Sequence, residues 1–255
     1  MKILTVAGFT LLRLRRSRYL LSGAILLAIT LGIHWLSTAR ADIGSPGDVQ
    51  WAQDFARFVG WLAAIWLGLG LVQADQADGA LRSMLTRPIS LPEVLFGKAL
   101  GGFAALAAFA LAADATVAVA AGLRGASVSW PMLAYLPATL PAQGMVLAAT
   151  MLLAQALPRF AAGVAALLVR DEFFSDHALG TYARFLPESV MNVFAPFAHA
   201  AYWVMPPTSA YFVGYREFAA AEHDWLLAAL TMPYAPLYAA AACLLAAALL
   251  SRREL

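Results

Sequence analysis

Charged residues are scarce in this chain. Aspartate, glutamate, lysine and arginine make up 13% of its 255 residues, about half of the roughly 25% that is usual in a soluble domain. Hydrophobic residues make up 62%, and the formal net charge is only +2. This composition excludes a large water-soluble domain and gives no indication of a nucleic-acid partner. It predicts an all-α, polytopic membrane protein with a single transmembrane domain over residues 1–255.

The chain also lacks the sequence motifs of several kinds of catalytic and binding site. Its one cysteine, Cys243, cannot form an intrachain disulfide. Gly97-Lys98 has no glycine five residues before it, so it is not a P-loop, and no Gly-x-Ser-x-Gly nucleophile elbow occurs. Histidines and cysteines never have the spacing that fixes two metal ligands on one face. We therefore expect no catalytic residue, metal or cofactor in this chain, so any ATP and Mg must be bound by another polypeptide.

Apolar runs of membrane length predict about six transmembrane helices, because one crossing needs about 20 residues. Residues 1–18 alternate apolar and basic positions, which predicts an amphipathic helix lying on the cytoplasmic leaflet. Spans 1 and 2 follow within 19–73, at 19–36 and 55–73, and a cytoplasmic loop is predicted at 74–98. Spans 3 and 4 lie within 99–156, at 99–121 and 132–156. A tilted or broken span 5 is predicted at 160–178, an outer loop at 179–230, and span 6 at 233–250. Within the outer loop, Val190–Met205 predicts an interfacial or re-entrant helix.

Basic residues predict the orientation of these spans. Six spans place both termini and the loop 74–98 on one side, which then carries 11 of the 17 basic residues. They are Lys2, Arg13, Arg15, Arg16, Arg18, Arg82, Arg87, Lys98, Arg159, Arg252 and Arg253. By the positive-inside rule this side is cytoplasmic. We expect a multi-pass protein of the plasma (inner) membrane with both termini inside.

Two ionisable residues fall within the predicted spans. His34 lies in the first and Asp114 in the third. Ionisable groups inside a membrane are candidates for function, so both are possible residues of a translocation path. The alternative is that neither residue has a functional role and that both lie near the outer ends of their helices, where polar side chains reach the interface at little cost.

An enzymatic function is the alternative prediction from another class. The outer segment 170–224 carries acidic residues and histidines: Asp171, Glu172, Asp176, His177, Glu188, His199, His223 and Asp224. Such residues can act as acids, bases or metal ligands, yet their spacing fixes no site, and a solvated outer loop with interface histidines explains them better. A membrane scaffold without transport activity is a third possibility.

Residues 75–98, DQADGALRSMLTRPISLPEVLFGK, form the long polar interruption in the first two thirds of the chain. Residues 79–86 predict a short amphipathic helix that ends before Pro88 and carries Leu81, Met84 and Leu85 on one side. Such an element is suited to place an apolar knob in the groove of a soluble protein. The alternative is a loop that only rests on the membrane surface.

This stretch resembles the permease subunit of type-2 ABC transporters, in particular the six-span group of the nitrous-oxide-reductase maturation permease. The resemblance rests on Asp75 and Asp78, Gly79-Ala80-Leu81, Ser83-Met84-Leu85, Thr86-Arg87-Pro88-Ile89-Ser90 and Gly97-Lys98. The sequence departs from the family at Ala80, where threonine is usual, at Arg82, where an acid is usual, and at Leu91, where arginine is usual.

The resemblance implies an ATP-driven exporter or mechanical device whose ATPase is a separate ATP-binding cassette subunit. In that family this loop and the N-terminal amphipathic helix contact the ATPase. The residues implied in ATPase coupling are Asp75, Asp78, Gly79, Leu81, Met84, Leu85, Arg87 and Pro88. The permease is expected to form a homodimer, or a heterodimer with a sister permease, surrounded by membrane lipid.

Overall fold

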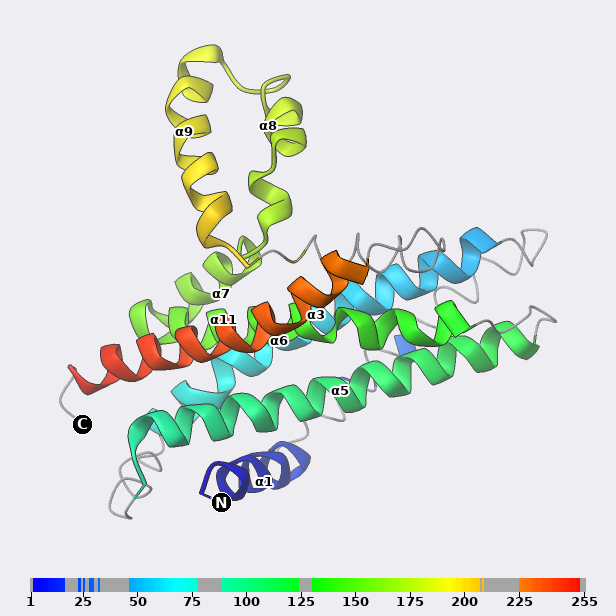
Figure 1. Ribbon diagram of the computed structural model, residues 1–255, viewed down its shortest axis with the longest axis vertical. Coiled ribbons are helices and arrows are strands. Elements are labelled where there is room, and N and C mark those ends of the chain that lie inside the picture. Colours follow the sequence, from blue (N-terminus) through cyan, green and yellow to red (C-terminus); the bar gives the residue numbers. More distant parts are fainter. Residues whose placement is uncertain are drawn as a thin grey trace.

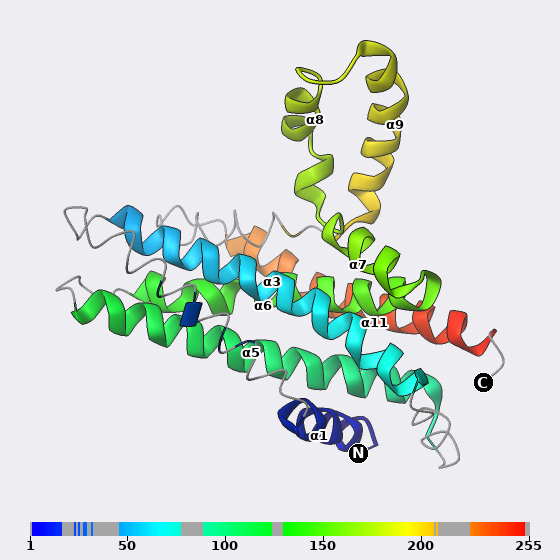
Figure 2. The same cartoon turned by 180° about the vertical axis from the view of Figure 1, so that it is seen from behind.

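The computed structural model describes residues 2–16, 46–77, 89–123, 130–206 and 225–252, together with Gly23, Ile25, Ala28, Ile29, Gly32 and Thr208. Within these residues every regular element is a helix, as the composition predicts. Figure 1 and Figure 2 show a bundle of long helices with a smaller helical hairpin projecting from one side.

Four long helices form the bundle: α3 (Pro46–Ala77), α5 (Leu91–Leu123), α6 (Trp130–Ala156) and α11 (Trp225–Ser251). Each contains a segment long and apolar enough to cross a membrane: Gln53–Gln73, Leu91–Val119, Thr139–Ala156 and Pro233–Ser251. Helices α3, α6 and α11 run in one direction and α5 runs against them (Figure 1). The end at which α5 begins and the other three helices finish is called the Lys98 end, and the opposite end the Asp114 end. This is the architecture of a helical membrane protein.

Helices α3 and α6 pack closely because α3 presents small residues to α6. Gly60, Ala64 and Gly68 recur every four residues, which places them on one face of α3. A Cβ added to Gly68 would lie 2.7 Å from the Cβ of Thr150 and 2.9 Å from the carbonyl oxygen of Leu147. Any side chain there would push two backbones apart, so glycine sets the spacing of this helix pair.

The predicted spans agree with the bundle in part. The predictions 55–73, 132–156 and 233–250 overlap candidate spans of α3, α6 and α11, although α11 begins earlier, at Trp225. The predicted first span, 19–36, lies mostly outside the described residues. The loop predicted at 37–54 is also shorter in the structure, because α3 already begins at Pro46. The described residues thus contain four candidate spans, and six remains a prediction.

The fifth span, predicted at 160–178, does not form one helix. Helix α7 (Arg159–Leu167) has nine residues and is about 14 Å long, which is half of the roughly 30 Å of a bilayer core. The chain is extended at Arg170 and continues as the 3₁₀ helix η1 (Asp171–Phe174). The break occurs at the charged run Arg170-Asp171-Glu172, where a continuous apolar helix would have to carry three charges.

Partners distant in the sequence stabilise this break. The Arg170 guanidinium lies 5.1 Å from the ring centre of Trp61 in α3 and 5.7 Å from that of Phe173, within the range of cation–π attraction. The Thr208 hydroxyl donates to the Asp171 carboxylate at 2.9 Å, and both residues are buried. The charged run is therefore held by specific contacts.

Residues 171–204 form the projecting hairpin (Figure 1). The sequence predicts residues 171–178 as the end of span 5 and the remainder as outer loop with one helix. The hairpin consists of η1, α8 (Asp176–Tyr182) and α9 (Glu188–Val204). Ala198 and Ala201 of α9 pack against Phe174 and Leu179. Helix α9 corresponds to the predicted Val190–Met205 segment, whose interfacial or re-entrant position stays a prediction.

Candidate functional site

The residues implied in ATPase coupling fall largely outside the described part of the chain. Asp75 lies in the last turn of α3, two residues before the helix ends at Ala77. The others, Asp78, Gly79, Leu81, Met84, Leu85, Arg87 and Pro88, lie outside the described residues. The structure does describe the two helices that flank them, which fixes where this segment leaves and rejoins the bundle: at the Lys98 end (Figure 1).

The loop predicted at 74–98 is shorter in the structure. Residues 74–77 belong to α3, and α5 begins at Leu91, so Gly97 and Lys98 lie two turns inside a helix. The candidate span of α5 begins at Leu91, eight residues before the predicted start of the third span at residue 99. Pro92 does not delay the start of α5, because proline is well tolerated in the first turn of a helix.

Ser90 and Glu93 fix the start of α5, a role that sequence reasoning missed. The Ser90 backbone N–H donates to Glu93 Oε2 at 2.7 Å, and the Ser90 hydroxyl donates to the same oxygen at 3.0 Å. The Val94 N–H donates to the Ser90 carbonyl at 3.1 Å. Ser-x-x-Glu before an apolar run is the pattern of a capping box, so this signal was present in the sequence.

Replacing Glu93 by alanine should loosen the first turn of α5. The substitution removes the acceptor of both Ser90 bonds, and loss of such a cap typically speeds local opening by roughly fivefold. Hydrogen exchange of amides 91–94 in detergent or nanodiscs measures this. Glu188→Ala, at the start of α9, is the control and should leave these amides unchanged. Equal exchange in wild type and Glu93→Ala would contradict the assigned cap.

The N-terminal helix α1 (Lys2–Arg16) docks on the first turns of α5. It buries Val6, Ala7, Thr10 and Leu14, and Figure 1 and Figure 2 both show it alongside α5. It leaves apolar residues exposed as well, including Leu4 and Phe9. The sequence predicts an amphipathic helix here, and the structure adds that one of its faces is seated on the protein.

Two glycines make this docking possible. A Cβ added to Gly97 would lie 2.5 Å from the Cβ of Val6 and 2.9 Å from the carbonyl oxygen of Ile3. A Cβ on Gly101 would lie 2.8 Å from the carbonyl oxygen of Ala7. The Gly-x-x-x-Gly spacing of α5 therefore brings the α1 backbone into direct contact with it. The spacing is visible in the sequence, but its partner is not.

Polar side chains tie three bundle helices together at the same end. The buried Lys98 ammonium of α5 donates to the Leu71 carbonyl of α3 at 2.6 Å. The Gln73 amide of α3 donates to the Ala154 carbonyl of α6 at 3.1 Å. In a low-dielectric interior such bonds are stronger than in water. The flanks of the predicted coupling segment are therefore fixed to the bundle and to each other.

Asp114, a candidate for a translocation path, lies between α5 and α3. It is 5% exposed and accepts a hydrogen bond from the equally buried Gln53 of α3. Its Oδ1 atom has no hydrogen-bond partner. The other candidate, His34, lies outside the described residues. The structure thus gives Asp114 a partner on a neighbouring helix, while its part in a path stays a prediction.

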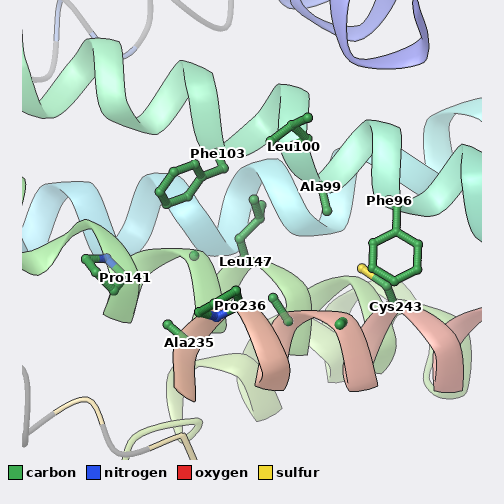
Figure 3. Close-up of a pocket in the computed structure, with 12 residues that line it drawn as sticks. Phe96, Ala99, Leu100, Phe103, Pro141, Leu147, Ala235, Pro236 and Cys243 are labelled. Carbon is green, nitrogen blue, oxygen red and sulfur yellow. The ribbon is translucent and has the colours of Figure 1, made fainter. Parts of the chain in front are cut away.

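An apolar cavity of about 450 Å³ lies between α5, α6 and α11 (Figure 3). Its walls include Phe96, Leu100 and Phe103 of α5, Leu147 of α6, and Pro236 and Cys243 of α11. These residues lie within the candidate spans. Asp114 is not among the residues that line it.

The outer acidic residues and histidines come together only as a pair in the described region. His199 Nδ1 lies 3.7 Å from Asp176 Oδ1, and both side chains are mostly exposed. Within the described residues no group of three or more histidine, cysteine, aspartate or glutamate side chains could hold a metal ion. His223 and Asp224 lie outside the described residues. The pair resembles a solvated surface contact more than a built catalytic site.

Comparison with known proteins assigns no family to this chain. The sequence matches no family model, and no curated protein matches it. The functional assignment therefore rests on the residues themselves.

Proposed function

We propose that this chain is the membrane subunit of an ATP-driven transporter of the type-2 ABC class. It spans the plasma (inner) membrane several times, binds separate ATP-binding cassette subunits, and pairs with a second copy or with a sister permease. The observation that carries the proposal is the Lys98 end of the bundle. There, α1 and the segment between α3 and α5, the two elements that the resemblance assigns to ATPase contact, meet on one helix.

The contacts at the Lys98 end support a mechanical role. A force applied to α1 reaches α5 through Gly97 and Gly101, where backbones touch. It passes from α5 to α3 through Lys98, and from α3 to α6 through Gln73. Packed helices joined in this way move as a body rather than bend. Closure of two ATPase subunits would thus shift several spans together and drive export, or a mechanical task across the membrane.

Capture of an ATPase by the tagged chain tests the proposal. Wild-type protein should co-purify with a P-loop ATP-binding subunit, and Leu85→Asp should weaken that association at least tenfold. The new carboxylate would enter an apolar contact, and about 1.4 kcal/mol already corresponds to a factor of ten. Quantitative mass spectrometry of the captured proteins is the measurement.

Phe185→Asp is the matched control for this experiment. Phe185 is an 80% exposed apolar residue in the turn between α8 and α9, and Figure 1 shows that turn away from α1 and from the start of α5. It should leave ATPase capture unchanged. The proposal fails if the wild-type chain captures no ATP-binding subunit, or if Leu85→Asp and Phe185→Asp capture it equally well.

A further inference from the structure

The cavity between α5, α6 and α11 has the form of a slot along the helix axes (Figure 3). On α5 its wall runs from Phe96 to Phe103, and on α11 from Ala235 to Cys243. These stretches rise over seven and eight residue steps, which is about 10–12 Å at the helical rise. Because the helices cross the membrane, the long direction of the slot follows the direction of lipid acyl chains.

Small residues keep the slot open. Ala239 and Ala240 line it on α11, and Gly144 lines it on α6. The Phe103 ring rests against Gly144, where an added Cβ would lie 3.0 Å from the ring edge. The Phe103 ring therefore lies at the wall, and Ala239 and Ala240 on the opposite helix place only methyl groups in the space between them and α5. The slot is a consequence of these residue sizes.

The lining excludes a polar ligand. No lining residue carries a charged, hydroxyl or amide side chain, and the Cys243 thiol is its most polar side-chain group. A polar molecule would lose its hydrogen bonds with water there and gain none. A hydrocarbon chain fits this surface, because each methylene that it buries adds to the binding free energy.

The charges at the Lys98 end select the kind of lipid. Cys243, at one end of the slot, is nine residues or about 14 Å from Arg252 along α11. Other exposed cations at this end are Lys2, Arg15 and Arg16 of α1. Two acids of the described helices belong to this end: Glu93, which accepts both Ser90 bonds, and Asp75 in the last turn of α3, so the basic residues named here outnumber the acids. A lipid whose chain enters the slot from this end therefore meets a predominantly basic surface, which attracts an anionic headgroup.

We propose that the slot holds one acyl chain of an anionic phospholipid from the leaflet at the Lys98 end. The chain lies between Phe96, Phe103 and Cys243, and the headgroup lies at the Lys98 end near Arg252. The bound lipid fills the gap between α5 and α11 and so forms part of the bundle. This inference requires the protein to lie in a membrane, but it does not rest on the proposed transporter function.

Photo-crosslinking in nanodiscs tests the proposal. The full-length protein is reconstituted with phosphatidylglycerol that carries a diazirine in one acyl chain, and crosslinked peptides are mapped by mass spectrometry. Labelling of 96–103 and 235–243 should exceed that of the exposed α11 positions Leu244 and Leu245 at least fivefold. Ala239→Trp, which fills the slot, should abolish this excess. Leu244→Trp, on the exposed face of α11, should preserve it.

Three results would overturn the proposal. Equal labelling of the slot and of Leu244 would mean ordinary lipid contact around the bundle. Equal enrichment with a phosphatidylcholine probe would contradict the preference for an anionic headgroup. Protein–protein crosslinks through the slot would assign it to a second copy of the chain. If Ala239→Trp does not fold, Ala240→Leu is the alternative variant, because its side chain fills less of the slot. It should also reduce the labelling excess.

Discussion

Replacing Gly101 by leucine should release α1 from the bundle. The first carbon of the new side chain would lie 2.8 Å from both the Ala7 carbonyl oxygen and the Thr10 Cβ. Backbone atoms cannot yield as a flexible side chain does, and overpacking of this kind costs about 1–3 kcal/mol. The burial of Val6, Ala7 and Leu14 would be lost with the contact. We expect amide exchange in residues 6–14 to accelerate at least tenfold in nanodiscs.

A second glycine on the same helix provides the control. A Cβ added to Gly122 meets nothing within 4 Å, so Gly122→Leu should leave α1 protected. If α1 forms part of the ATPase contact, Gly101→Leu should also reduce ATPase capture, and Gly122→Leu should not. Unchanged protection of α1 in Gly101→Leu would show that the helix does not depend on this contact.

Substitution of Gly68 by alanine should separate α3 from α6. The added methyl group meets the Leu147 carbonyl oxygen at 2.9 Å and the Thr150 Cβ at 2.7 Å. Alanine favours a helix over glycine by about 1 kcal/mol, yet overpacking against backbone costs about 1–3 kcal/mol. These two values leave a net loss of about 0–2 kcal/mol in the free energy of unfolding, and we expect the upper part of this range because one of the two contacts is with a backbone oxygen. Unfolding in mixed detergent micelles measures it.

Gly163→Ala in α7 is the matched comparison. Its added methyl group would meet only the Leu69 Cδ1 methyl, at 3.3 Å, and the end of a leucine side chain can turn away. The helix-propensity gain should then dominate, and stability should stay the same or rise slightly. Equal destabilisation by the two substitutions would contradict the assignment of α3–α6 spacing to Gly68.

The apolar runs predicted the core of the bundle because membrane spans are defined by composition over about 20 residues. The third span was placed too late because Gly97 and Lys98 look polar in the sequence. Lys98 is buried because Leu71, 27 residues away, offers it a carbonyl oxygen, and no local pattern reveals such a partner. The Ser90–Glu93 cap, by contrast, is a local pattern that a reading for capping boxes would have found.

The sequence indicates which part of the chain forms the candidate site, but not which residues contact one another there. The polar stretch after α3 predicts at which end of the bundle the candidate coupling segment lies, because its flanking spans are recognisable. That α1 would sit on Gly97 and Gly101 was not predictable, since small-residue spacings recur throughout an alanine-rich chain. Likewise the charged run after α7 suggested a broken span, while its contacts with Trp61 and Thr208 depend on the folded chain.

The hydrogen bonds of α5 to α3 have a consequence for how the protein enters the membrane. Both ionisable residues buried in α5 find their partners on α3: Lys98 at the Leu71 carbonyl and Asp114 at Gln53. An ionisable side chain without a partner in the apolar interior of a membrane is costly. Helix α5 alone offers neither group its partner, whereas α3 supplies a carbonyl oxygen to Lys98 and an amide to one carboxylate oxygen of Asp114. The helical hairpin α3–α5 is therefore the natural unit of insertion during biogenesis.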